Sequence, residues 1–327
     1  MTYTKTVTLP VSPDDAFALV TRPERLRRWM GVTARIDLRA GGDWRWTVTP
    51  GKVAAGTVVE VEPGRRVVLD WGWDQMPGDD GALGTVTITI EPVADGSAVT
   101  LVHDGLTAEQ EVSHAEGWDH FLGRLELAAA AGDAGPDAWA AAPDPIDEIV
   151  AGEAALAVVQ QVLRQIGPAD ATRPTPCADF TVAELADHLL GSLVSFGAMA
   201  GVELSRPATD LDRLEDVVST LAAEVLEAWR RRGLDGVATS QVGEAPAAVL
   251  AGIVPIELLL HAWDLAQATG ATLTVSDPLV DYVAVLAERV VPGARGRAFA
   301  DEVMPGADDD ALTRLAAYSG RTPLALV

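Results

Sequence analysis

The hydrophobic pattern of this 327-residue chain changes its period once, on either side of a stretch rich in Ala, Gly, Pro and Asp. Before this stretch, which runs from Ala131 to Pro145, apolar and polar residues alternate as they do in β-strands. After it, apolar residues recur at helical spacing. A stretch of this composition builds neither strand nor core, so it predicts a linker. We expect a domain at 1–131, a linker at 132–146 and a second domain at 147–327, which suits a chain of this length.

The first part of the chain predicts an α+β domain. In Thr85 to Ile90 the aliphatic side chains fall on one face and the threonines on the other, as in an antiparallel sheet packed on one side. A capping box at Thr107 to Gln110 begins a long helix whose apolar stripe is Trp118, Leu122 and Leu125. We expect a curved, meandering sheet around this helix, with an apolar cavity between them.

The second part predicts an all-α domain. Thr181 and Glu184 form a capping box at the start of a helix that carries His188. A further apolar helix is expected from Pro246 to Thr269, and Pro255 requires that this helix either kink before Glu257 or begin near it. The remaining helices are expected at Asp147 to Ile166, Leu211 to Arg232, Pro278 to Val291 and Asp309 to Tyr318.

The formal charge of −24 argues against nucleic acid or an anionic membrane as a partner, because either would repel such a surface. The start of the chain lacks the features of a signal peptide, and we find no apolar run long enough to span a bilayer. The single cysteine, Cys177, excludes an intrachain disulfide. We therefore expect a cytoplasmic protein whose partner is a small-molecule ligand or substrate.

Glu257 and His261 interrupt an apolar run four residues apart, so they share one face of a helix and could hold one ion. His188, in a similar setting on another helix, would complete a set of two histidines and one carboxylate. Such a set leaves metal positions open for water or substrate. The alternatives are an internal pair between His261 and Glu257, and a core histidine at His188.

Asp264 and Arg321 are candidate catalytic residues. Asp264 lies on nearly the same face as Glu257, where it either orients a ligand histidine or is a solvated acid at the helix end. Arg321 could bind a substrate carboxylate through two hydrogen bonds, or be a solvated arginine near the chain end. Cys177 is interpreted as a small buried side chain rather than a nucleophile.

The second domain resembles the mycothiol-dependent maleylpyruvate isomerase branch of the DinB-like four-helix metalloproteins. The resemblance rests on Pro174-Thr175-Pro176-Cys177, Phe180-Thr181-Val182, Leu185-x-x-His188-Leu189, Glu257-Leu258-Leu259-Leu260-His261-Ala262-Trp263-Asp264 and Gly320-Arg321-Thr322-Pro323. It implies a four-helix bundle in which His188, Glu257 and His261 bind a divalent metal, usually zinc. It also implies that a low-molecular-weight thiol such as mycothiol binds beside the metal.

The first domain resembles the START-like SRPBCC superfamily, in the subgroup similar to the activator of Hsp-type chaperone ATPase. The resemblance runs through Val11-Ser12-Pro13-Asp14-Asp15-Ala16-Phe17, Arg28-Trp29-Met30, Gly41-Gly42-Asp43-Trp44, Gly56 to Pro63, Leu101 to Leu106 and Gly117 to Leu122. It implies a helix-grip fold and supports ligand binding more than any one reaction.

Three functions are compatible with these patterns. The first is a metal-dependent thiol transferase or isomerase of small electrophilic or apolar substrates, fused to a domain that binds a hydrophobic ligand. The alternative is a non-catalytic protein that sequesters hydrophobic small molecules, as a stress or resistance factor. A third, a chaperone co-factor, rests on the subgroup of the first domain alone. An open three-ligand metal set favours the enzyme, because structural zinc sites usually have four protein ligands.

Overall fold

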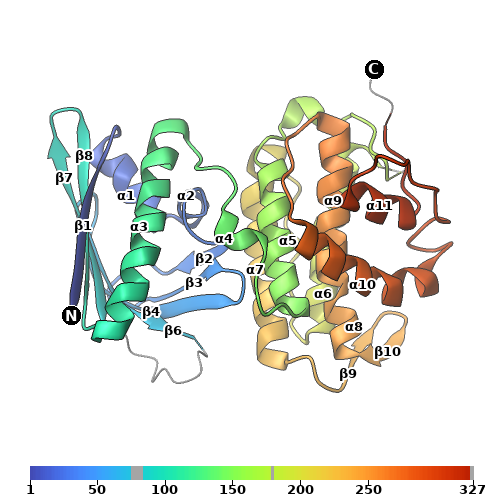
Figure 1. Ribbon diagram of the computed structural model, residues 1–327, viewed down its shortest axis with the longest axis horizontal. Helices are drawn as coiled ribbons and strands as arrows, with labels where there is room; N and C mark the ends of the chain where they lie inside the picture. Colours follow the sequence, from blue (N-terminus) through green and yellow to red (C-terminus); the bar gives the residue numbers. More distant parts are fainter. Residues whose placement is uncertain (75–83, 178–179, 325–327) are drawn as a thin grey trace. The chain divides into compact units, whose positions relative to one another are not determined.

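The computed structural model describes residues 1–74, 84–177 and 180–324 of the chain. It divides into two compact units, Met1–Asp137 and Ala138–Val327. Figure 1 shows a sheet with helices in the first unit and a helical second unit.

The N-terminal unit is built on one antiparallel sheet with the order β1-β8-β7-β5-β4-β3-β2, and β6 pairs with β4. From β2 to β8 neighbouring strands follow one another along the chain, apart from β6, and β1 joins beside β8. The sheet is therefore the expected meander with one strand added at its edge. Its strands are β1 (Thr2–Leu9), β2 (Thr33–Ile36), β3 (Asp43–Thr49), β4 (Lys52–Glu62), β5 (Arg66–Asp70), β6 (Gly72–Trp73), β7 (Thr85–Val93) and β8 (Gly96–Asp104).

One face of this sheet packs against the helices α1 (Pro13–Thr21), α2 (Pro23–Leu26) and α3 (Ala108–Ala131). In β7 the aliphatic side chains are buried and the threonines lie on the more exposed face, as predicted. Thr107 caps α3 through the expected box with Gln110, and the predicted stripe of Trp118, Leu122 and Leu125 is buried in the core. An antiparallel sheet that holds a long helix is the helix-grip arrangement expected of this part of the chain.

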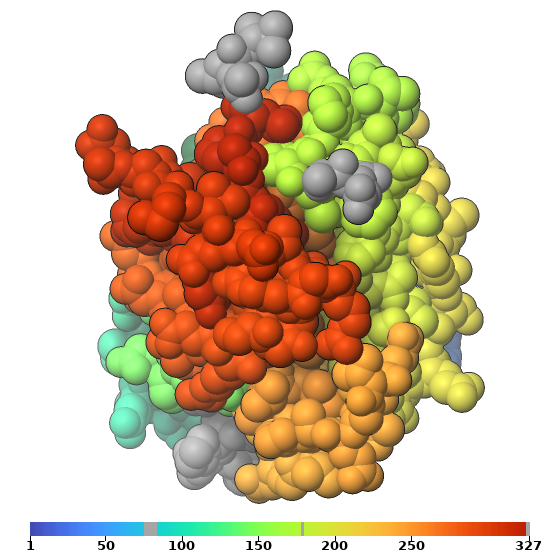
Figure 2. All heavy atoms as spheres, turned by 90° about the vertical axis from the view of Figure 1, so that its right-hand side faces the viewer, coloured from blue at the N-terminus to red at the C-terminus, as the bar shows by residue number. Residues whose placement is uncertain are grey.

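The C-terminal unit contains four long helices that pack in a ring. Contacts join α5 to α9, α9 to α6, α6 to α7 and α7 to α5, while α10 and α11 pack on α9. The bounds are α4 (Ala138–Ala141), α5 (Glu148–Leu163), α6 (Val182–Met199), α7 (Leu214–Arg232), α8 (Ala247–Ala251), α9 (Ile253–Thr269), α10 (Asp277–Ala294) and α11 (Ala311–Tyr318), with short 3-10 turns η1 (Pro168–Asp170) and η2 (Leu211–Arg213). On the face seen in Figure 2, the orange-to-red segment from α10 to α11 lies beside the light-green region that contains α6.

Two features of this unit differ from the sequence prediction. A two-stranded hairpin, β9 (Val237–Ser240) and β10 (Gly243–Pro246), interrupts the expected all-α pattern. The helix expected from Pro246 to Thr269 is divided at Gly252 into α8 and α9, so the helix that carries Glu257 begins near that residue, which is one of the two predicted alternatives. Pro255 lies in the first turn of α9, where a missing N–H costs no helical hydrogen bond.

The prediction that no apolar run is long enough to span a bilayer was wrong. Among the described residues, Ala247–Thr269 is 23 residues long with a mean hydropathy of 1.6 in its most apolar window, which suffices by length and composition. However, 78% of that window is buried inside the unit, as in the central helix of a bundle.

The predicted linker also carries more structure than its composition suggested. Asp133 pairs with Arg28, and the Arg124 guanidinium donates hydrogen bonds to the carbonyl oxygens of Gly135 and Pro136. Further along, α4 packs on α5. Side chains from outside the linker bind these backbone groups, so composition within the linker could not predict the contacts.

Candidate metal site in the helical unit

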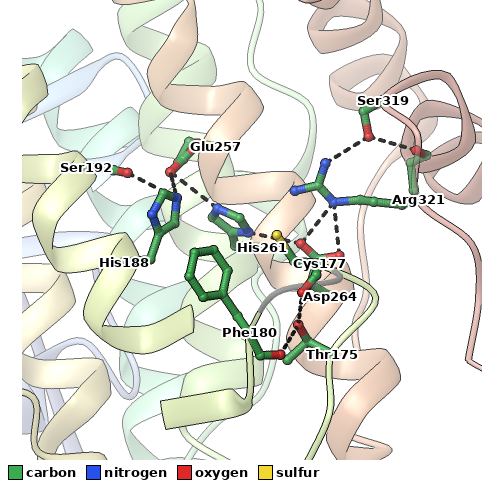
Figure 3. A network of polar contacts seen from close by, with 11 residues as sticks. Thr175, Cys177, Phe180, His188, Ser192, Glu257, His261, Asp264, Ser319 and Arg321 are labelled. Atoms are coloured by element: carbon green, nitrogen blue, oxygen red, sulfur yellow. Dashed lines mark hydrogen bonds and ion pairs between the residues drawn. The ribbon is translucent and has the colours of Figure 1, made fainter. Parts of the chain in front are cut away.

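Two helices place the three predicted ligands. Thr181 caps α6 through the predicted box with Glu184, which fixes where that helix begins and hence which face carries His188. On α9, Glu257 and His261 lie one turn apart. Figure 3 shows all three side chains pointing toward one another from α6 and α9.

The three side chains converge on one carboxylate oxygen. The Nε2 atoms of His188 and His261 each lie 3.2 Å from Oε1 of Glu257. One potential ligand atom from each residue lies within 4.8 Å of the other two. The sequence analysis grouped these residues, and the structure brings them together at a spacing compatible with a shared ion.

The hydrogen bonding at this point is incomplete. Within the described part of the chain, Oε1 of Glu257 and Nε2 of His261 are buried and make no hydrogen bond of acceptable geometry, although they lie 3.2 Å apart. Buried polar atoms without a hydrogen bond are costly, so such a pair calls for another partner. Two imidazole nitrogens and a carboxylate oxygen are ligands that zinc and other divalent metals accept. The donor set therefore fits a divalent metal.

Electrostatic interactions within the site shift the pKa values of both buried groups, His261 and Glu257. Burial lowers the pKa of His261, but the charge of Glu257 and a hydrogen bond to Asp264 outweigh it and raise the pKa to about 9. Burial opposes ionisation of Glu257, but the two histidines hold its pKa well below the usual 4.5. Without a metal, Glu257 is therefore ionised and His261 is protonated at neutral pH.

Asp264 is completely buried, and its Oδ2 lies 2.9 Å from Nδ1 of His261. Of the two alternatives left open by the sequence, the structure has the one in which Asp264 contacts the ligand histidine. A carboxylate at Nδ1 fixes the proton there and leaves Nε2 to face a metal.

Arg321 is buried against Asp264. Its side chain is buried, and Nε donates to both carboxylate oxygens of Asp264, at 3.0 and 2.9 Å. Its Nη1 donates to Oγ of Ser319 at 3.0 Å. The alternative of a solvated arginine is therefore wrong. A contact of Arg321 with a substrate carboxylate stays a prediction, and its Nε is already engaged by Asp264. Sequence spacing could not predict this contact between residues 57 positions apart.

A groove of about 970 Å³ opens beside the ligands. His188 lines it with a side chain that is 39% exposed, and the ring of Phe180 stacks on His188 at 5.0 Å between centroids. The groove therefore connects solvent to His188, one of the three predicted ligands. It is lined by Phe180, Ala183, Glu184, Asp187, His188, Gly191, Ser192, Ser195, Phe196, Arg206, Thr209 and Leu211.

Cys177 lies in the loop before α6, and its side chain is half-buried rather than fully buried. Its carbonyl oxygen accepts hydrogen bonds from Oγ1 of Thr175 at 3.1 Å and from the backbone N–H of Phe180 at 2.9 Å. These contacts give the residue a role in holding the loop that carries Phe180.

The N-terminal unit contains an aromatic cluster that the sequence analysis did not single out. The Trp71 ring lies 4.9 Å from that of Trp44, 5.2 Å from Trp118 and 5.9 Å from His103, measured between centroids. The signal was present in the spacing, because Trp44 and Trp46 stand two apart on β3 and so share one face of the sheet.

Three indole N–H groups of this cluster have acceptors, and two do not. Trp118 donates to Nδ1 of His103 at 3.1 Å, Trp73 donates to Nε2 of His114 at 3.2 Å, and Trp44 donates to a backbone carbonyl. The N–H groups of Trp46 and Trp71 are buried without an acceptor among the described residues.

Comparison with known proteins shows a family model and a mycobacterial protein that each match part of the chain. Residues 10–130 match the family model of the Activator of Hsp90 ATPase homolog 1-like proteins. An uncharacterized protein of Mycobacterium tuberculosis is 32% identical over 155 residues, which cover 46% of this chain and 84% of that protein.

Two solved structures are similar to part of the chain. The solution structure of an AHSA1-like protein from Rhizobium etli is 36% identical, and the match covers 42% of this chain and 88% of that one, with a TM-score of 0.36. The solution structure of the Aha1 dimer from Colwellia psychrerythraea is 17% identical over 40% of this chain and 98% of that one, with a TM-score of 0.37. The chain thus belongs to one family with the mycobacterial protein, and its N-terminal unit is an AHSA1-like domain of the SRPBCC type.

Proposed function

We propose that the C-terminal unit binds a divalent metal, such as zinc, through His188, Glu257 and His261. We further propose that it acts as a metal-dependent thiol transferase or isomerase on small substrates. One observation carries the proposal: Oε1 of Glu257 and Nε2 of His261 face one another and His188 without a proper hydrogen bond. Three protein ligands leave room for a thiol or substrate, as catalytic sites do.

A bound metal at this point would lower the pKa of a thiol or polarise a substrate carbonyl. The chain's own residues prepare the site for this chemistry. Asp264 holds the proton of His261 at Nδ1, and Phe180 stacks on His188 at the mouth of the groove. Addition of a thiolate to an activated alkene would give an enolate. Rotation about the new single bond and elimination of the thiolate would be isomerisation, whereas return to the enolate of the proton that the thiol released would complete a transfer.

The charges in the groove favour an uncharged substrate. Arg206 pairs with the Asp187 carboxylate at 2.5 Å, and Glu184 caps α6 at Thr181. These charged groups are thus already engaged within the protein. Ser192 and Ser195 contribute hydroxyls, while Phe196 and Leu211 add apolar surface.

The first experiment measures metal content and thiol consumption in the same preparations. Protein purified without added metal should contain close to one divalent metal per chain, and should consume a low-molecular-weight thiol in the presence of activated alkenes or quinones. His261→Ala should lose metal and turnover together. The matched control, His120→Ala in the N-terminal unit, should keep both.

Cys177→Ala separates metal chemistry from protein-thiol chemistry. We expect its turnover to stay within about threefold of the wild type, because an alanine keeps the carbonyl oxygen that accepts hydrogen bonds from Thr175 and Phe180. Unchanged thiol consumption in His261→Ala would contradict the metal mechanism. Loss of turnover in Cys177→Ala with the metal retained would indicate that the Cys177 thiol is itself the nucleophile.

The second candidate function, sequestration of a hydrophobic small molecule in the N-terminal unit, has its own support. AHSA1-like domains bind small hydrophobic ligands, and two buried indole N–H groups here lack an acceptor among the described residues. An aromatic ligand that carries a carbonyl or ether oxygen would stack on the tryptophans and accept from Trp46 and Trp71. A cytoplasmic location is part of both proposals.

Titration with quinones and flavone-type aromatics, followed by tryptophan fluorescence, tests this candidate. Trp71→Phe and Trp46→Phe should each weaken binding, because each removes one N–H donor while it keeps an aromatic ring. Trp139→Phe, which changes a tryptophan of the C-terminal unit that is 42% exposed, should not. Equal affinity in all four proteins would rule out this binding mode.

A further inference from the structure

The segment that follows α11 returns to the middle of α9. Gly320 adopts a positive φ of 89°, and a Cβ at this position would meet the backbone oxygen of Ala300 at 2.9 Å. The chain can make this turn because glycine has no Cβ. The turn brings the buried Arg321 side chain against Asp264.

From this turn a chain of hydrogen bonds runs to the ligand histidine (Figure 3). Oγ of Ser319 donates to the carbonyl oxygen of Ala316 at 2.7 Å and accepts from Nη1 of Arg321 at 3.0 Å. Nε of Arg321 donates to Asp264, whose Oδ2 faces Nδ1 of His261 at 2.9 Å. An arginine only donates and a carboxylate only accepts, so Nδ1 of His261 must be the donor at the end of the chain.

We propose that Arg321 is a positioning residue for the metal ligand His261 and acts through Asp264. Its guanidinium donates a hydrogen bond from Nη1 to Ser319 and another from Nε to Asp264. These two bonds keep the carboxylate from rotating away from His261. The His261 ring is thereby fixed with Nε2 directed at Glu257 and the position for the metal. A lysine would keep the positive charge but lacks the planar, two-point geometry.

The metal part of this inference rests on the proposed function, but the positioning itself does not. The full-length variants for the test are Arg321→Met, Arg321→Lys and the milder Ser319→Ala. Arg314→Met is the matched control, because Arg314 is an exposed arginine of α11 that bonds a backbone carbonyl.

The first readout uses the metal-free protein. The Nδ1–H of His261 should give a downfield, slowly exchanging proton resonance in histidine-selective NMR spectra of the wild type and of Arg314→Met. In Arg321→Met this resonance should broaden or exchange quickly, because Asp264 has lost the group that holds it. An unchanged, slowly exchanging resonance in Arg321→Met would overturn the proposal.

The second readout is the dissociation constant for Zn²⁺, measured by competition with a chelator, together with the visible spectrum of the Co²⁺ form. Removal of groups that hold a metal ligand typically weakens metal binding by about 10- to 100-fold, and we expect a loss in this range for Arg321→Met. Arg321→Lys and Ser319→Ala should lie between this variant and the wild type.

These outcomes separate the two proposals. A wild type that binds no metal but loses the His261 resonance in Arg321→Met would contradict the proposed function and leave the positioning role intact. Wild-type Zn²⁺ affinity and an unchanged Co²⁺ spectrum in Arg321→Met would show that Arg321 only stabilises the fold. Ser319→Ala keeps the test decisive if Arg321→Met fails to fold, because an unchanged resonance and Zn²⁺ affinity in that variant would also contradict the proposal.

Discussion

At the scale of single residues, the proton on His261 competes with the proposed metal. The pKa of His261 is raised from 6.5 to about 9, because the attraction of Glu257 and Asp264 exceeds the effect of burial. In the metal-free protein this proton contributes stability that is complete below about pH 6.5 and is lost as the pH rises through about 9. A metal needs the lone pair of Nε2, which is occupied by a proton when the imidazole is charged.

We therefore predict that the affinity for Zn²⁺ rises by about tenfold per pH unit between pH 6 and pH 8, because binding displaces one proton. The rise should level off near pH 9, where His261 becomes neutral without a metal. Calorimetry in buffers of different ionisation enthalpy would count the released protons. An affinity that does not change between pH 6 and pH 8 would contradict the prediction.

The spacing of Glu257 and His261 was enough to predict that they share a helix face, because helical geometry is local. The contact of Arg321 with Asp264 was not predictable, since the two residues lie 57 positions apart and the contact depends on a turn at Gly320. The buried indoles of Trp46 and Trp71 were missed for a similar reason. Their missing acceptors become visible only when neighbouring strands are in place.

At the scale of elements, the start of α6 connects helix stability to the site. Thr181 accepts from the backbone N–H of Glu184, and the Glu184 side chain accepts from the backbone N–H of Thr181. The preceding residue, Phe180, stacks on His188. The cap therefore positions both the helix and the aromatic ring beside the groove.

Thr181→Ala should lower the free energy of unfolding by about 1 kcal/mol, the usual effect of losing an N-cap side chain. Urea unfolding would measure this loss. The control is Thr239→Ala on an exposed position of β9, which should change stability by less than about 0.5 kcal/mol. Equal effects of the two substitutions would mean that the capping box contributes no stability of its own.

Periodic apolar residues and caps were sufficient to predict the long helices and several strands. The hairpin of β9 and β10 escaped prediction because each strand has four residues, too few to show a period. Pro255 was enough to predict that the helix carrying Glu257 kinks or begins near that residue, and α9 begins at Ile253. The position of the break at Gly252 was not predicted, because a glycine is compatible with a continuous helix.

At the scale of the whole molecule, the chain is organised as two units with their own interiors. Asp133, Gly135 and Pro136 bond to side chains of the first unit, and α4 packs on α5 of the second. The most exposed part of the predicted linker is therefore shorter than its composition suggested. It lies at 142–146, after α4.

We predict that limited proteolysis with a protease of broad specificity first cuts between residues 142 and 146, where the backbone lies outside α4 and α5 and is accessible. Fragments 1–137 and 138–327, expressed separately, should each unfold cooperatively. Mass spectrometry would locate the cut, and circular dichroism would follow unfolding. Failure of both fragments to fold would show that each unit depends on the other.

Because the three proposed ligands come from two helices, α6 and α9, metal binding would depend on an intact tertiary structure. In an unfolded chain His188 is no longer held beside Glu257 and His261, so the site exists only while the bundle is intact. By mass action, each tenfold increase in free metal above its dissociation constant would add about 1.4 kcal/mol to the stability of the folded state. The unfolding temperature of this protein would then report the metal supply around it, with no substrate present.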